Sequence, residues 1–340
     1  TCAGACLNTM RQELPAVAGS AGAVGWHEGA MLRHEGHEAA PVPPSLKVEA
    51  DKELGLGKNE AGVLHPAPAL AIATTHKLMH LSDLHFGAHD PLVCAAVQRL
   101  AHRLRVDVVV VSGDLTQRAT RQQFALAHDF VCGLGVDERV VLAGNHDLPL
   151  FAWWLRWGRA YQRFASQFGA QLEPQRQVGP FWIVGVNTTR PWRHERGTLS
   201  AAQVTRVAED LRSAPAQAWR IVVSHHPLVA RSAEDRSHRP HGADTAVQRW
   251  RDAGAHMLLS GHVHHPALLQ PLPGLWSMQA GTAVSRRLRS GQPNSLVVLQ
   301  TQSGPTGALG RQYPHRFAQR WDFDARSGDF VCVESMPVAG

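Results

Sequence analysis

The sequence predicts an α/β fold, and three observations carry that prediction. Short apolar runs of strand length alternate with segments of helical period along most of the chain. Hydrophobic residues make up 44% of the 340 residues and charged residues 18%, which is enough apolar material for a packed core. No stretch of about 18 uncharged apolar residues occurs, so no membrane-spanning helix is expected.

Residues 1–76 differ in composition from the rest. They are rich in Ala, Gly, Pro and Glu and sustain neither a helical nor a strand period, so we expect a poorly structured N-terminal extension. No basic segment followed by an apolar one is present, and no signal peptide is expected. The five dispersed cysteines form no disulfide framework or zinc-ribbon pattern, which favours a reducing, cytoplasmic compartment.

The alternating pattern begins at Lys77. Apolar runs predict strands over 78–81, 106–111, 139–142, 181–186, 220–223 and 256–259. Between them, apolar residues repeating at three and four predict helices over 91–105, 120–134, 200–211 and 243–253. The aromatic residues of 150–176 have the same spacing and predict a further amphipathic helix, with a packing role; they are Trp153, Trp154, Trp157, Tyr161, Phe164 and Phe168.

Beyond residue 275 the pattern predicts strands only. They are expected over 275–280, 295–300, 317–323 and 330–334, with a hairpin turn over 324–328.

Five of the predicted strands are followed by side chains that bind metals or transfer protons. These are Asp83 and His85, Asp114, Asn145 with His146 and Asp147, His225 with His226, and His262 with His264. Ligands of open α/β sheets bind beyond the carboxyl ends of the strands, so these groups would converge on one rim if the strands are neighbours. Asp83 to Asp114 and Asp114 to Asn145 each span 31 residues, the length of a strand–helix–strand unit.

The chemistry of this set indicates transition metals. Carboxylate, amide and imidazole donors suit Mn²⁺, Fe²⁺ or Zn²⁺ better than all-thiolate or all-oxygen sites do. The donors exceed what one metal needs, whereas two metals about 3.5–4 Å apart and bridged by a carboxylate would use them. Gly113, Gly144 and Gly261 each precede a candidate ligand, where glycine permits a tight bend.

In order and spacing, these motifs resemble the five blocks of the calcineurin-like metallophosphoesterase superfamily, over about residues 77–300. The chain is especially similar to the bacterial branch that includes class III cyclic-nucleotide phosphodiesterases. Gly281-Thr282-Ala283, Arg286-Arg287 and Pro293-Asn294-Ser295 resemble that branch too, as a less specific signal. The resemblance implies a four-layer α-β-β-α sandwich of two mixed sheets flanked by helices. Residues 77–300 would form the catalytic domain, and 301–340 the C-terminal strands completing the second sheet.

The resemblance also implies roles for the candidate residues. Asp83, His85 and His264 would hold one divalent metal, Asn145, His225 and His262 the other, and Asp114 would bridge both. The metals (Mn, Fe or Zn) would activate a water as hydroxide for in-line attack on phosphorus. His146 would protonate the leaving oxygen as general acid, and Asp147 would orient its imidazole and keep it protonated. His226 would support the site or face solvent.

The implied activity is a dimetal-dependent phosphodiesterase acting on small or nucleotide phosphodiesters, cyclic nucleotides among them. Asn145-His146-Asp147 differs from the Asn-His-Glu typical of protein serine/threonine phosphatases, and His146 differs from the arginine usual in the lipid A branch. A DNA nuclease of the same superfamily and a non-enzymatic scaffold for protein partners are the alternatives. The few residues after the core leave little space for a nuclease's capping domain, so nucleic acid is not the favoured substrate. The intact ligand set and general acid speak against the scaffold.

Arginines near the motifs are candidates for contacts to substrate. Arg118, Arg286 and Arg287 could each bind a phosphate in a bidentate manner, although a solvated surface role is the simpler interpretation. Gln117 stands where an acidic residue is common in similar proteins, which weakens any inference about substrate from that motif.

Overall fold

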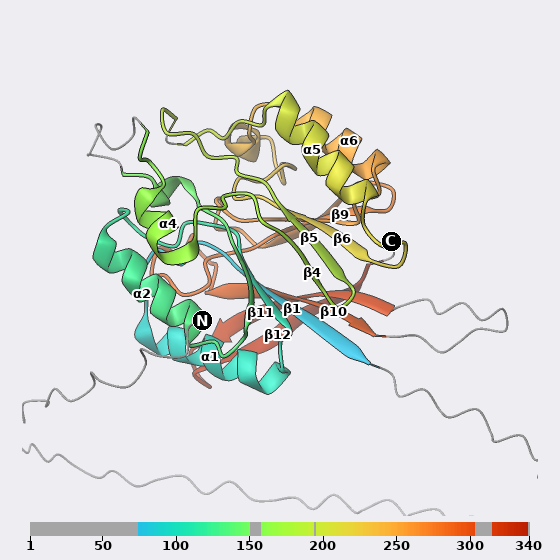
Figure 1. Ribbon diagram of the computed structural model, residues 1–340. Coiled ribbons are helices and arrows are strands. Elements are labelled where there is room, and N and C mark those ends of the chain that lie inside the picture. Colours follow the sequence, from blue (N-terminus) through green and yellow to red (C-terminus); the bar gives the residue numbers. More distant parts are fainter. Residues whose placement is uncertain (1–73, 150–157, 194, 303–314, 339–340) are drawn as a thin grey trace, which may run out of the picture. The chain divides into compact units, whose positions relative to one another are not determined.

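The computed structural model describes residues 74–149, 158–193, 195–302 and 315–338 (Figure 1). The predicted N-terminal extension lies outside these residues except for 74–76, and so do Trp153, Trp154 and Trp157. Thr75 and His76 belong to the first strand, so the described body begins slightly before the predicted boundary at 77.

One sheet has six strands in the order β12-β11-β10-β1-β2-β3. Its members are β1 (Thr75–Leu81), β2 (Val108–Val111), β3 (Glu138–Val141), β10 (Ser295–Gln302), β11 (His315–Asp324) and β12 (Asp329–Pro337). β1, β2 and β3 are parallel, and β10, β11 and β12 follow beside β1 in antiparallel pairs. The predicted turn is present between β11 and β12, where the Gly328 N–H donates to the Asp324 carbonyl at 2.9 Å.

The C-terminal strands belong to a different sheet from the one expected. They were expected to complete the second sheet, but β11 and β12 extend the sheet of β1. The reason is that β10 pairs with β1, and each later strand pairs with the one before it in sequence.

The other sheet has the order β4-β5-β6-β7-β9-β8. Its members are β4 (Gln175–Val178), β5 (Phe181–Gly185), β6 (Trp219–Val223), β7 (Met257–Ser260), β8 (Ala267–Leu272) and β9 (Leu275–Gln279). β5, β6, β7 and β9 are parallel, whereas β4 and β8 pair antiparallel at the two edges. These edge strands were not predicted, because β4 is mostly polar and β8 contains Pro271.

The four predicted helices are confirmed to within two residues at each end. They are α1 (Pro91–Leu104), α2 (Arg121–Cys132), α5 (Ala201–Arg212) and α6 (Ala243–Asp252). Asp90, Thr120 and Ser200 cap the first three by accepting backbone N–H bonds. The long aromatic helix expected over 150–176 is wrong in extent: its described part is α4 (Gln162–Phe168), and β4 already begins at Gln175. None of the helices among the described residues is long and apolar enough to cross a membrane.

Successive side chains of the central strands point to opposite faces of each sheet, one toward helices and one toward the other sheet, so the fold has four layers. In β2, Val109 and Val111 pack with α1 and α2, while Val108 and Val110 pack toward the other sheet. In β6, Ile221 and Val223 face the first sheet and Val222 packs with α5 and α6. Figure 1 shows α5 and α6 over one sheet and α1 and α2 against the other. The predicted sandwich of two mixed sheets flanked by helices is confirmed.

Candidate metal centre

The five polar motifs lie at the carboxyl ends of strands that belong to two different sheets. β1, β2 and β3 come from one sheet, and β6 and β7 from the other. The two sheets are joined there, since the backbone N–H of His262 donates to Asp83 Oδ2 at 2.9 Å. The predicted convergence therefore occurs, but across the gap between two sheets rather than along the rim of one.

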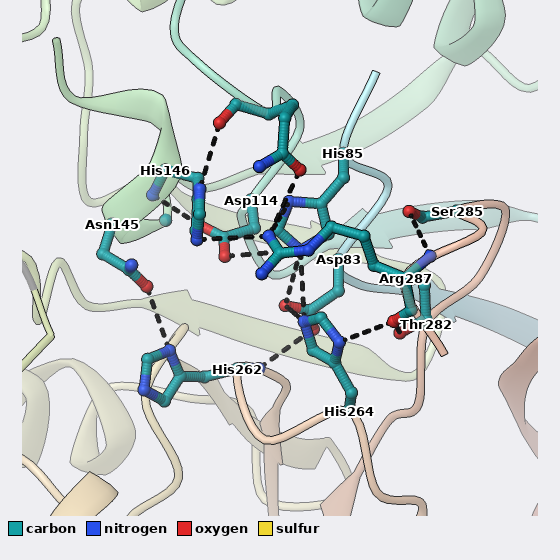
Figure 2. A network of polar contacts seen from close by, with 12 residues as sticks. Asp83, His85, Asp114, Asn145, His146, His262, His264, Thr282, Ser285 and Arg287 are labelled. Atoms are coloured by element: carbon teal, nitrogen blue, oxygen red, sulfur yellow. Dashed lines mark hydrogen bonds and ion pairs between the residues drawn. The ribbon is translucent and has the colours of Figure 1, made fainter. Parts of the chain in front are cut away.

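One group of donor atoms, from Asp83, His85, His264 and Asp114, lies around a common point. The Nε2 atoms of His85 and His264 lie 3.1 Å apart, and Asp83 Oδ1 lies 3.2 Å from His264 Nε2 and 3.8 Å from His85 Nε2. Asp114 Oδ2 lies 3.7 Å from His85 Nε2. These are the four residues predicted for the first metal (Figure 2).

A second group faces the other oxygen of Asp114. Asn145 Oδ1 lies 2.9 Å from both His225 Nε2 and His262 Nδ1. Asp114 Oδ1 lies 3.4 Å from His225 Nε2. The two carboxylate oxygens of Asp114 thus point to separate donor groups, which is the geometry that a bridging ligand requires.

The donors fit divalent transition metals. Two ligand atoms that are each about 2.1 Å from one ion lie about 3.0–3.4 Å apart. Five of the separations above lie between 2.9 and 3.4 Å, and the two between His85 and the carboxylates of Asp83 and Asp114 are longer, at 3.8 and 3.7 Å. Asp83 Oδ1 is buried without a hydrogen-bond partner, as expected of an atom reserved for a cation. The described residues include groups of three donors that could each hold an ion, among them Asp83, His85 and His264, and Asp114, His225 and His262.

The charges of the site are balanced by protonated imidazoles when metals are left aside. Burial favours neutral carboxyl groups, but His264 and His225 outweigh it and hold the pKa of Asp83 below its usual range. The pKa of Asp114 lies well below normal for the same kind of reason, with His225 as its main partner. Burial would lower the pKa of His225, but Asp114 reverses this and raises it to about 9. Cations at this place would take over that role.

The backbone at the site is strained. Five of the seven candidate metal ligands have φ between 44° and 71°; these are Asp83, His85, Asp114, His262 and His264. The left-handed conformation costs a non-glycine residue about 1–2 kcal/mol. Such strain persists where the surrounding structure enforces it, and it concentrates at functional sites. Here the left-handed backbone lets side chains two residues apart, such as Asp83 and His85, point toward the same place.

Two of the three predicted glycines serve close packing rather than a bend. A Cβ atom at Gly144 would overlap the backbone and carboxylate of Asp114, and one at Gly261 would overlap Ser82 and the Asp83 carboxylate. Only Gly113, with φ of 109°, uses the conformational freedom that was expected of all three.

His146 stands at the mouth of the site. Its Nδ1 lies 3.1 Å from the Gln117 carbonyl oxygen, and its ring is edge-on to that of His85 with centroids 4.9 Å apart. Its Nε2 lies 3.3 Å from Nη1 of Arg287.

Asp147 does not have the predicted contact with the imidazole. Its carboxylate accepts hydrogen bonds from the backbone N–H groups of Gly144, Leu115 and Thr116, and from the Thr116 hydroxyl. The expectation that Asp147 orients His146 is corrected: the Gln117 carbonyl does so, and Asp147 ties together the loops after β2 and β3. Burial and the nearby Asp114 raise the pKa of Asp147 to about 7, against these backbone donors.

A cavity of about 380 Å³ opens above the two donor groups. It is lined by Asp114, Asn145, His146, Glu195, His238, His262, His264, Arg287, Leu288 and Arg289. The predicted substrate contact Arg118 is exposed and does not line it. Sequence reasoning missed Glu195, His238, Leu288 and Arg289. Glu195, Leu288 and Arg289 come from irregular loops, whereas His238 ends a short 3-10 helix, and the high histidine content was the only signal for it.

His226 lies behind the ligands and is buried. Its Nδ1 lies 2.7 Å from the Thr188 hydroxyl, and its ring centroid is 4.6 Å from that of His262. Of the two expectations for His226, the structure favours support of the site over exposure to solvent.

Several solved structures are similar in fold. Purple acid phosphatase PPD1 from yellow lupin (Lupinus luteus) seeds has a TM-score of 0.60 at 14% identity, covering 78% of this chain and 54% of that one. A dimetal phosphatase from Danio rerio has 0.53 at 13% identity, with 78% and 98% covered. GAP50, the anchor in the inner membrane complex of Plasmodium, has 0.51 at 12%, with 78% and 89% covered. At these identities the likeness concerns the fold alone, and this chain spans about half the length of the lupin enzyme.

No curated protein sequence matches the chain. A model of the family described as calcineurin-like phosphoesterase matches residues 76–266, which is more than half of the chain and contains all seven candidate metal ligands. The chain belongs to the calcineurin-like phosphoesterase family.

Proposed function

We propose that the chain is a dimetal-dependent phosphodiesterase that hydrolyses small or nucleotide phosphodiesters, cyclic nucleotides among them. The observation that carries the proposal is Asp114, whose two oxygens face separate donor groups at the floor of one cavity. Bound Mn, Fe or Zn ions would supply Lewis-acid activation of water and of the phosphoryl group. Asp83, His85 and His264 would hold one ion, Asn145, His225 and His262 the other, and Asp114 both.

The protein's own part in the reaction centres on His146. The Nδ1–H group of His146 donates a hydrogen bond to the Gln117 carbonyl oxygen, which fixes the ring and leaves Nε2 for the substrate. As the bond between phosphorus and the leaving oxygen breaks, the Nε2 proton passes to that oxygen. One water is consumed, and the products are a phosphomonoester and an alcohol, which belong to one molecule when the substrate is a cyclic nucleotide.

The size of the cavity supports a small substrate. Its volume of about 380 Å³ is near the lower end of the range for small-molecule pockets. A mononucleotide diester is therefore favoured over a polymer. We also propose a reducing, cytoplasmic setting, because the five dispersed cysteines of the sequence have neither the spacing of a disulfide framework nor that of a zinc ribbon.

The test combines metal analysis with a substrate series. Protein supplied with Mn²⁺ should bind two ions per chain and hydrolyse bis(p-nitrophenyl) phosphate and cyclic nucleotides faster than p-nitrophenyl phosphate. His146→Ala should keep both ions and lose about 10²–10⁴-fold in kcat, with the larger loss for poor leaving groups. Degradation of single-stranded DNA with strong salt dependence would favour the nuclease instead. A folded, metal-loaded sample that is inactive on every ester would favour the scaffold.

A further inference from the structure

The side chain of Arg287 reaches into the cavity beside the candidate general acid. Its Nη1 atom lies 3.3 Å from His146 Nε2 and 3.2 Å from Gln117 Oε1 (Figure 2). The same atom lies 3.5 Å from His85 Nδ1. The guanidinium group is therefore placed over the mouth of the first donor group.

The backbone of Arg287 is held in place by its loop. His264 Nδ1 lies 3.0 Å from the Arg287 carbonyl oxygen, and the Arg287 N–H donates to Ser285 Oγ at 3.1 Å. Asn294 Nδ2 in turn donates to the Ser285 carbonyl at 2.8 Å. The segment 281–295, which the sequence singled out, thus fixes one metal-ligand candidate and presents one arginine.

The contacts of the guanidinium are weak ones for a cation. Among the described residues no carboxylate forms an ion pair with Arg287, whereas its neighbour Arg286 pairs with Asp90 at 3.3 Å. The partners of Arg287 are a neutral amide and imidazole nitrogens. Once His85 gives Nε2 to a metal, its Nδ1 carries the ring proton and cannot accept a hydrogen bond.

We propose that Arg287 is the phosphate clamp of this site. On substrate binding its guanidinium leaves His146 and Gln117 and donates to a non-bridging phosphoryl oxygen, which is a stronger acceptor because it is charged. The same movement exposes His146 Nε2, which then takes up a proton from solvent and can donate it to the leaving oxygen. The clamp deepens the proposed function and rests on it, and it identifies the phosphoryl anion as the group that this loop recognises.

The other nearby arginines are less suited to this role. Arg289 lines the cavity, but its Nε donates to the Val263 carbonyl at 3.2 Å. Arg286 is turned to Asp90, and Arg118 is exposed outside the cavity. Arg286 is therefore a matched control, adjacent in sequence and equal in charge.

The experiment compares Arg287→Met, Arg287→Lys and Arg286→Met in Mn²⁺-loaded protein. Calorimetric titration with inorganic phosphate should show affinity lowered about 10- to 100-fold in Arg287→Met, the loss expected for charge-assisted hydrogen bonds. Arg287→Lys should recover part of it, because lysine keeps the charge but not the planar fork. Arg286→Met should bind as the unaltered protein does. Metal content should be equal in all variants, since the contact to His264 uses the main chain.

The outcomes separate the clamp from the proposed function. Kinetics with bis(p-nitrophenyl) phosphate should show a raised KM in Arg287→Met. Unchanged phosphate affinity in that variant would overturn the clamp, even if kcat falls, because it would leave Arg287 with only a positioning role toward His146. Phosphate binding that depends on Arg287 in a protein that hydrolyses no ester would uphold the clamp and refute the phosphodiesterase. Absence of phosphate binding in the unaltered protein would refute the clamp directly.

Discussion

The Nδ1 atom of His238 lies 3.3 Å from the Nε2 atom of His262. His262 turns its other nitrogen toward Asn145 Oδ1, into the second donor group. If Nδ1 of His262 binds a metal, the ring proton of His262 is on Nε2, and Nδ1 of His238 accepts the hydrogen bond from it. His238 would then fix the tautomer of His262, as partners of metal-bound histidines commonly do.

His238→Ala should weaken the second metal and spare the first. Such partners typically contribute about 10–100-fold to metal affinity. Competition with a chelator should show one of two Mn²⁺ ions released at lower chelator concentration. Arg236→Ala is the control, because Arg236 lies on the same short 3-10 helix (Glu234–His238) but is exposed. Equal retention of both ions in both variants would contradict the assignment.

Metal binding should release a proton and become stronger as pH rises. The neighbouring Asp114 raises the pKa of His225 to about 9 in spite of burial, so at neutral pH the metal-free protein holds a proton that a metal must displace. A raised histidine pKa stabilises the fold below its unfolded value of about 6.5, and this stability is lost as pH rises through about 9. The melting temperature of chelator-treated protein should therefore fall over this window, while that of metal-loaded protein changes less.

The proton release can be counted by calorimetry. Titrations with Mn²⁺ in buffers of different ionisation enthalpy near neutral pH should differ in apparent enthalpy by the amount for proton transfer to buffer. Identical enthalpies in all buffers would show that His225 is already neutral.

Four of the five motifs could be predicted because they directly follow strands whose carboxyl-terminal residues are buried, whereas the motif that begins at Asn145 follows the edge strand β3 and stands out by its own residue types. Val108–Val111 reads as an unbroken apolar run for that reason, and Asp114 stands out after it. Gln175–Val178 has no such apolar run, because three of its four residues are polar, and it was not predicted.

The partners of the motifs could not be predicted. Glu195 and Leu288 lie in loops without period and His238 ends a short 3-10 helix, and only the packing of the two sheets brings these segments together. The role of Asp147 was missed because its partners are backbone N–H groups, which every sequence offers.

Gly261→Ala should remove the first metal and destabilise the fold. The added Cβ would overlap Ser82 and the Asp83 carboxylate, so the backbone or the ligand has to move. Overpacking of this kind costs about 1–3 kcal/mol. Gly274→Ala is the control: it has φ of 77° with open space around it, and it should lose stability without losing metal. Two ions per chain in Gly261→Ala would show that the close approach is not needed.

Glu195→Gln should shift the preference between monoesters and diesters. Glu195 lines the cavity that also contains Arg287, and its carboxylate repels the second negative charge of a phosphomonoester. A diester carries one charge less and is repelled less. Removing the charge should raise kcat/KM for p-nitrophenyl phosphate relative to bis(p-nitrophenyl) phosphate about two- to tenfold, more at low salt than at high salt. Glu209→Gln, exposed on α5, should leave the ratio unchanged. A ratio that also stays constant in Glu195→Gln would mean that charge at this wall does not select the substrate.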